Sequence, residues 1–131
     1  MKFSSLGLAP EIQRAVVACR YKEMTDIQEK AIAPARRGKD LLASAQTGTG
    51  KTAAFALPIL QQMHDKPEPT LAGKTRALIL APTRELAEQL AETIKRYAQF
   101  MPVTVTALYG GVKMSAQEKK LKANINIVVS T

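Results

Sequence analysis

The chain has 131 residues, 46% of them apolar and 23% charged, as expected for a soluble globular protein, and it is long enough for one domain at most. Lysine and arginine number 19 against 11 aspartates and glutamates, so the net charge of +8 favours a polyanionic partner, although a generally basic surface is an equal alternative. The single cysteine, Cys19, excludes an internal disulfide, and no apolar run is long enough to span a membrane, so we expect a cytoplasmic protein that is not membrane-bound.

Two helices are predicted near the N-terminus, ahead of the first strand. The first covers residues 10–19, with Pro10 in its first turn and apolar residues spaced for one buried face. The second covers residues 26–36, because Thr25 and Gln28 match a capping box, in which the N-cap residue and the third helical residue exchange hydrogen bonds.

The rest of the chain alternates strands and helices. Strands are predicted at four short apolar or β-branched runs, residues 40–44, 77–81, 103–108 and 125–129. The unbroken apolar character of the second run predicts a sheet covered on both faces. Helices are predicted over residues 53–63, from Thr83 with a buried face, and from Ser115; the face from Thr83 consists of Leu86, Leu90, Ile94 and Tyr97. This alternation implies right-handed βαβ units and an α/β fold with a mostly parallel sheet of about four strands.

A glycine-rich stretch joins the first predicted strand to the next helix. Its residues are Ala45, Gln46, Thr47, Gly48, Thr49, Gly50, Lys51 and Thr52. A loop between a strand end and a helix start points several N–H groups at one spot, where the helix dipole is positive, and this favours a phosphate chain. Lys51 is placed to reach the β- and γ-phosphates, and the Thr52 hydroxyl to bind Mg²⁺. The usual pattern has glycine where Ala45 stands, so this position tolerates a methyl group or has a different backbone. An ordinary glycine-rich turn with an exposed lysine is the alternative.

Three further motifs accompany this stretch. Residues 81–87 read Ala-Pro-Thr-Arg-Glu-Leu-Ala, a glycine doublet stands at 110–111, and residues 127–131 read Ile-Val-Val-Ser-Thr. Together with residues 45–52, these motifs make the chain resemble the start of a DEAD-box ATP-dependent RNA helicase, most similar to the bacterial RhlE-type branch. The resemblance implies a three-layer RecA-like P-loop domain, incomplete here. Residues 1–131 would be part of the first such domain, with the Q motif at about 3–28, motif I at 45–52 and motif Ia at 81–87, and the second RecA-like domain is absent.

The resemblance also implies an adenine site upstream of motif I. Gln28 would hydrogen-bond the adenine edge, Tyr21 would stack on the ring, and Thr25 would support the loop. Two residues depart from the family pattern: Met24 stands where proline is usual, and Arg20 where glycine is usual. Without the resemblance, Thr25 and Gln28 are explained by a capping box alone, and the two roles are compatible.

By the same resemblance, RNA would contact residues that follow the strands, namely Pro82, Thr83, Arg84, Gly110, Gly111 and Thr131. Thr83 and Arg84 stand at a strand-to-helix turn, where open α/β sheets bind ligands and where a hydroxyl, a guanidinium and free N–H groups suit a phosphate backbone. Binding would therefore be largely independent of RNA sequence. A salt bridge from Arg84 to Glu85 or Glu88 on its own helix is the alternative.

The sequence contains neither Asp-Glu-Ala-Asp nor Ser-Ala-Thr. In the family, the first motif binds Mg²⁺ and orients the attacking water, so Lys51 and Thr52 are the catalytic groups present, and Thr52 would hold Mg²⁺ through ATP. We expect ATP hydrolysis and unwinding by the parent protein but negligible turnover by these residues alone, an expectation that RNA-stimulated ATP hydrolysis by the 131-residue polypeptide would refute.

The missing motifs also bear on the sheet. The resemblance places the strands that carry them between residues 40–44 and the other three predicted strands, which leaves a gap two strands wide. We favour an excerpt of a longer chain over a differently closed sheet or association of copies, and the oligomeric state stays open.

Two other functions compete with the helicase hypothesis. A P-loop kinase or GTPase would leave residues 81–87 unexplained, and no Asn-Lys-x-Asp guanine-reading motif occurs. A non-catalytic nucleic-acid-binding module with a vestigial P-loop would keep its nucleotide affinity when Lys51 is replaced. His64 stands apart from any second histidine or cysteine cluster, so no metal role is predicted for it, and Cys19 is interpreted as a small packed side chain.

Overall fold

The computed structural model describes residues 1–67, 75–110, 115 and 125–131. The chain divides into two compact units, one of Met1–Pro67 with Arg96–Met101 and one of Glu68–Lys95 with Pro102–Thr131. One boundary falls inside helix α4 (Arg84–Tyr97), and the last two residues of this helix belong to the first unit. Each unit has its own buried residues and is described by itself.

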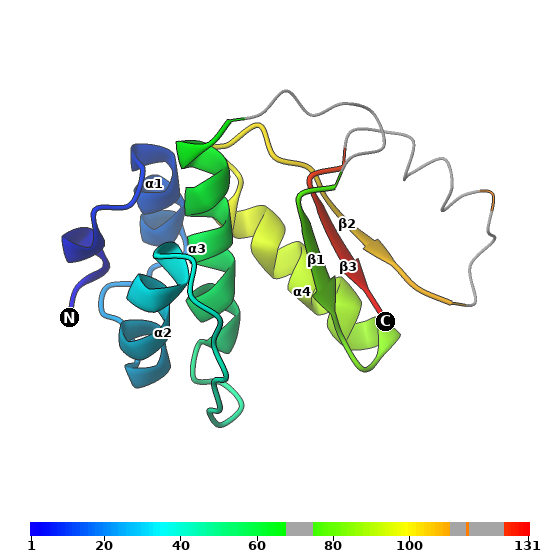
Figure 1. The fold of residues 1–131 in the computed structure, drawn as a ribbon, viewed down its shortest axis with the longest axis horizontal. Helices are drawn as coiled ribbons and strands as arrows, with labels where there is room; N and C mark the ends of the chain where they lie inside the picture. The colour runs from blue at the N-terminus through cyan, green and yellow to red at the C-terminus, as the bar shows by residue number, and fades with distance from the viewer. Residues whose placement is uncertain (68–74, 111–114, 116–124) are drawn as a thin grey trace. The chain divides into compact units, whose positions relative to one another are not determined.

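The first unit is helical. It contains η1 (Phe3–Leu6), α1 (Pro10–Ala18), α2 (Asp26–Arg36) and α3 (Lys51–Asp65), and α3 contacts both α1 and α2, as Figure 1 shows. The predicted first and second helices are confirmed, and α2 has the predicted bounds. The core of the first unit is mostly aliphatic, with Phe3 and Tyr97 as buried aromatic residues. The largest fully buried side chains of this unit are Ile12, Val16, Ile32, Leu57, Pro58 and Leu60.

A buried glutamine fixes α3 against the start of α1. Gln61 is 4% exposed, and its Oε1 accepts a hydrogen bond from the Ala9 N–H at 2.8 Å. Its Nε2 donates to Asp65 Oδ1, also at 2.8 Å. Both polar ends of the amide are therefore satisfied, which is what a buried amide requires. The helix that follows the glycine-rich loop is thus tied to a second element.

The second unit contains a parallel sheet of three described strands, β1 (Ala77–Leu80), β2 (Val105–Leu108) and β3 (Ile127–Ser130), in the order β1-β3-β2 (Figure 1). Leu80, Ser130 and Leu108 lie in register, so all three strands end at the same edge. These strands confirm three of the four predicted ones, with ends shifted by one or two residues. The parallel sheet confirms the predicted α/β class.

Helix α4 (Arg84–Tyr97) follows β1, as the sequence predicts. Its fully buried side chains are Ala87, Ala91, Ile94 and Tyr97, whereas Leu86 and Leu90 are only half-buried. The predicted buried face is therefore correct in direction but is centred on the alanines, with the leucines at its margin. Small residues at the centre of such a face allow close packing of the helix backbone.

Two predictions about the sheet are wrong. Residues 40–44 form no strand, and Leu41 and Leu42 are 48% and 106% exposed. A strand persists only when a neighbour takes its backbone hydrogen bonds, and none of the described strands pairs with this segment. The second wrong prediction is coverage of both faces, because Leu78 and Leu80 on β1 are 64% and 71% exposed. β1 is an edge strand of the described sheet, whereas the central strand β3 is buried along most of its length.

Gly111, the second glycine of the doublet, lies outside the described residues. The helix predicted from Ser115 also lies outside them, except for Ser115 itself. Within the part of the chain that the structure describes, no helix combines the length and the apolar character needed to cross a bilayer.

Candidate functional site

The glycine-rich loop ends where α3 begins. Gly50 is the N-cap of α3, and Gly48 and Gly50 have φ angles of +81° and +82°, in the left-handed region. The Thr49 hydroxyl donates to the Gln46 carbonyl, which closes the loop, and the Ala54 N–H makes the first helical hydrogen bond, to Gly50 O at 3.2 Å. The first N–H groups of a helix have no partner within it, so those of α3 point out toward the loop.

Lys51 and Thr52 occupy the first turn of α3, Lys51 exposed and Thr52 half-buried. The lysine and the threonine therefore belong to the same turn as the free N–H groups. Ala45 has an ordinary backbone, because Arg20 is the only non-glycine residue with positive φ among the described residues. The alanine at this position therefore needs no left-handed conformation.

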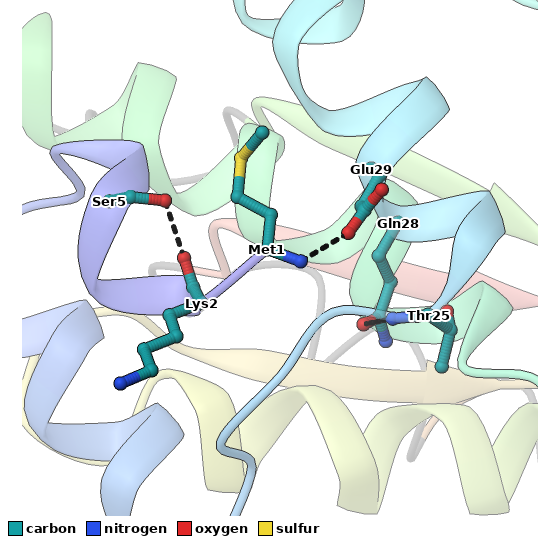
Figure 2. A network of polar contacts seen from close by, with 6 residues as sticks. All are labelled: Met1, Lys2, Ser5, Thr25, Gln28 and Glu29. Atoms are coloured by element: carbon teal, nitrogen blue, oxygen red, sulfur yellow. Dashed lines mark hydrogen bonds and ion pairs between the residues drawn. The ribbon is translucent and has the colours of Figure 1, made fainter.

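Gln28 joins α2 to this loop. Its Nε2 donates to the carbonyl oxygen of Gly50 at 3.1 Å, and its Oε1 accepts from the Thr25 N–H at 2.9 Å. The second bond belongs to the predicted capping box, which the structure confirms. Figure 2 shows the Thr25–Gln28 bond beside the ion pair from the Met1 amino group to Glu29. Gln28 is 4% exposed, so both of its polar atoms are buried and engaged.

Gly50 has no room for a side chain. A Cβ on Gly50 would lie 2.2 Å from Gln28 Nε2 and 3.4 Å from Thr25 Oγ1. A Cβ on Gly48, by contrast, would meet no described atom within 4 Å. Among the described atoms only its backbone angle favours glycine at position 48, whereas both the angle and the close contact with Gln28 favour glycine at position 50.

Tyr21 lies in a group of three aromatic rings. The ring of Phe3 stacks on it, with centroids 6.0 Å apart and planes at 27°. The ring of Tyr97 meets it edge-on at 6.0 Å, and the two hydroxyl oxygens are 3.1 Å apart. Tyr21 is 37% exposed, whereas Phe3 and Tyr97 are each 2% exposed. The sequence predicts a buried Tyr97 but gives no sign of its contact with Tyr21, 76 positions away.

The two departures from the family pattern have structural counterparts. Arg20 has φ +61°, the left-handed conformation for which glycine is the usual residue. The Met24 N–H donates to the Met1 carbonyl oxygen at 2.8 Å, a bond that proline has no N–H to make. The Met24 side chain is 8% exposed, so it also contributes apolar contact.

In the second unit, the predicted RNA-contacting residues gather at the edge where the three strands end. Residues 82–84 follow β1, Gly110 follows β2 and Thr131 follows β3, and all of these residues are exposed. Thr83 Oγ1 accepts from the Leu86 N–H at 3.1 Å, so Thr83 caps the start of α4. The carboxyl edge of a parallel sheet is the usual ligand-binding edge of such folds.

Arg84 makes no ion pair with Glu85 or Glu88 among the described residues, contrary to the alternative raised by the sequence. Glu88 instead accepts a hydrogen bond from the Tyr109 hydroxyl, and this bond is the main reason that the pKa of Tyr109 is raised. The Arg84 guanidinium is thus exposed and without a carboxylate partner in the described chain.

Neither Cys19 nor His64 belongs to these sites. Burial raises the pKa of the Cys19 thiol, which disfavours the nucleophilic thiolate. His64 lies between Glu11 and Asp65, at 3.5 Å and 3.6 Å. The described residues contain no group of histidines, cysteines and carboxylates able to hold a metal ion.

Comparison with known proteins decides the family. The profile of DEAD/DEAH box helicases matches residues 25–131. The chain belongs to this family.

Similar proteins are named as ATP-dependent RNA or rRNA helicases. The ATP-dependent RNA helicase CshA of Listeria monocytogenes is 45% identical over 130 residues, which are 99% of this chain and 24% of CshA. The ATP-dependent rRNA helicase RRP3 of Saccharomyces cerevisiae is 44% identical over 129 residues, 98% of this chain and 25% of RRP3. This DEAD/DEAH box chain thus spans about a quarter of the length of these relatives.

A solved structure agrees with the fold. A hypothetical ATP-dependent RNA helicase from Sulfolobus tokodaii matches with a TM-score of 0.81 and 35% identity, over 95% of this chain and 34% of that one. The chain therefore has the α/β fold of a RecA-like helicase domain, incomplete in this chain, as the sequence predicts.

Proposed function

We propose that this chain is the ATP-binding portion of an RNA helicase that unwinds or remodels RNA duplexes by using ATP hydrolysis. The observation that carries the proposal is the loop at residues 45–52, in which two left-handed glycines lead into the N-terminus of α3. Lys51 and Thr52 follow directly in the first turn of that helix. Backbone N–H groups, a helix dipole and an ammonium group converge there, an arrangement suited to the phosphates of a nucleoside triphosphate.

The groups of the loop have distinct roles in this proposal. Backbone N–H groups of residues 46–52 bind the phosphate oxygens, and Lys51 neutralises charge on the β- and γ-phosphates. The hydroxyl oxygen of the half-buried Thr52 is a hard ligand of the kind that Mg²⁺ prefers, and it would bind the ion together with the triphosphate. The ion would supply charge neutralisation at the terminal phosphates.

The adenine contacts proposed are Tyr21, Thr25 and Gln28. Tyr21 has an exposed ring available for stacking on a purine. Gln28 already uses both ends of its amide, on Thr25 and Gly50. Each end of the amide has one further hydrogen-bonding site, which an adenine edge would use, so base binding would be coupled to the N-cap of α3.

RNA binding is proposed for the exposed strand-end residues, Pro82, Thr83, Arg84, Gly110 and Thr131, together with Gly111. Arg84 supplies a guanidinium that has no carboxylate partner among the described residues, and the start of α4 supplies N–H groups. These groups suit phosphates and not base edges, so binding would be largely sequence-independent.

We further propose residues 1–131 as part of the first RecA-like domain of the parent protein, and a kinship with the RhlE-type branch of the family. A reducing, cytoplasmic location is supported by the single cysteine of the chain.

The test of ATP binding is calorimetric titration of the chain with Mg-ATP, comparing wild type with Lys51→Ala. Loss of a charged hydrogen bond to phosphate is expected to cost about 1.5–3 kcal/mol, or roughly 10- to 150-fold in affinity. Lys66→Ala removes the same charge at the other end of α3 and is expected to bind like wild type. Unchanged affinity in Lys51→Ala would favour a vestigial P-loop, and a preference for GTP over ATP would favour a different class of P-loop enzyme.

A further inference from the structure

We propose that Tyr97 is a positioning residue for the nucleotide base, because its hydroxyl holds the ring of Tyr21 in the orientation needed to stack on adenine. The inference rests on the proposed ATP site and adds to it a residue at the end of α4. Tyr97 does not touch the nucleotide in this proposal, and it acts through Tyr21.

The ring of Tyr21 is mounted on a short connection between α1 and α2. Its main chain is held by the hydrogen bond from the Tyr21 N–H to Val16 O at 3.1 Å. The preceding residue, Arg20, adopts the left-handed conformation at φ +61°. A side chain on such a connection has no helical neighbours to fix its rotamer. Its orientation therefore depends on contacts with more distant residues.

Two buried rings supply these contacts. Phe3 stacks against one face of Tyr21 with an offset, with centroids 6.0 Å apart and planes at 27°, which favours the opposite face for a purine. Tyr97 meets the ring edge-on, with planes at 61°, and its hydroxyl lies 3.1 Å from that of Tyr21. Phe3 thus decides which face is favoured, and the hydroxyl pair decides where the tip of the ring lies.

The hydroxyl of Tyr97 is suited to this role because its ring is buried. Tyr97 is 2% exposed, and a phenol in that position needs a polar partner, which Tyr21 provides. Burial, and then the hydrogen bond with the Tyr21 hydroxyl, raises the pKa of Tyr97 far above its ordinary value, so the group stays protonated at neutral pH. An anchored ring loses less rotamer freedom when a base stacks on it, and this favours binding.

The test compares Mg-ATP with Mg-bound inorganic tripolyphosphate, which engages the loop at residues 45–52 but has no base to stack. Calorimetric titration is carried out on the full chain and on Tyr97→Phe, Tyr21→Phe and the double variant. Tyr97→Phe is expected to weaken Mg-ATP roughly 2- to 10-fold, the effect of losing one hydrogen bond, and to leave tripolyphosphate unchanged. The double variant is expected to be no weaker than either single one, because both substitutions remove the same bond.

Tyr109→Phe is the matched control. This substitution also removes a hydroxyl group that makes a hydrogen bond, in this case to Glu88. Both residues belong to the second unit, so the ATP affinity of the variant is expected to equal that of wild type. Equal ATP affinity of Tyr97→Phe and wild type would overturn the inference, as would a parallel loss of ATP and tripolyphosphate binding. A wild-type chain that binds tripolyphosphate but not ATP would instead refute the proposed adenine site itself.

Discussion

The side-chain nitrogen of Gln28 donates a hydrogen bond to the carbonyl oxygen of Gly50 at 3.1 Å, so the capping residue of α2 contacts the N-cap of α3. The contact is close enough that a Cβ on Gly50 would lie 2.2 Å from that nitrogen. Gln28, the proposed base-reading residue, is thus hydrogen-bonded to the proposed phosphate-binding loop within one unit. Three of the following predictions test this arrangement and the loop beside it.

Gly50→Ala is expected to destabilise the chain more than Gly48→Ala. Both glycines have φ near +80°, so a side chain at either position costs about 1–2 kcal/mol in backbone strain. Only Gly50→Ala also displaces Gln28, which adds about 1–3 kcal/mol for a buried amide left unpaired. Urea unfolding of the two variants measures the difference, and equal losses would show that the contact contributes nothing.

Gln28→Glu is expected to lower the free energy of unfolding at neutral pH by about 1–3 kcal/mol, because a carboxylate accepts from Thr25 but has no hydrogen to donate to Gly50. Gln62→Glu is the control, since Gln62 donates to the Ala35 carbonyl at the same distance, 3.1 Å, but in an exposed place.

The effect of Gln28→Glu is expected to depend on pH. Burial and the facing carbonyl raise the pKa of the new carboxyl group in the folded state above the roughly 4.3 of an unfolded glutamate. The folded chain then binds a proton that the unfolded chain has released, so part of the lost stability returns as the pH is lowered. The measurement is the free energy of unfolding in urea, for the variant and wild type, at several pH values from neutral to mildly acidic. A difference between the two chains that stays constant over this range would show that the new carboxyl group faces water.

Arg20→Gly is expected to stabilise the chain by up to about 1 kcal/mol, because glycine adopts the left-handed conformation at φ +61° without steric cost. Arg37→Gly removes the same charge at a position with φ −81°, where glycine brings no relief, and is expected to lower stability by about 0.5–1 kcal/mol. The melting temperatures of the two variants should therefore move in opposite directions, and a lower value for Arg20→Gly would contradict the strain at this position.

Arg84→Ala is expected to weaken binding of single-stranded RNA to a similar degree for different sequences, because its guanidinium faces solvent at the strand-end edge and would contact phosphate. The slope of log affinity against log salt should fall in magnitude by roughly 0.7, the value for one phosphate of a single strand. Lys95→Ala removes one positive charge from the same helix, away from that edge, and serves as the control. Fluorescence anisotropy at several salt concentrations measures both, and equal effects would refute a specific role for Arg84.

The sequence by itself determined the features that depend on neighbouring residues. Thr25 and Gln28 predicted the start of α2, because a capping box is complete within four residues. The run from Gly48 to Thr52 predicted both the loop and the helix that follows it, because left-handed glycines and a helix start are local properties. The family followed from such short motifs, and comparison with known proteins confirmed it.

Only the tertiary structure decided the features that join distant residues. Residues 40–44 have the composition of a strand, yet they form none, because a strand needs a partner that no local pattern supplies. The bond from Gln28 to Gly50 spans 22 positions, and the hydroxyl pair of Tyr21 and Tyr97 spans 76. Such contacts depend on where the whole chain brings two side chains, and periodicity and motif spacing carry no information about that.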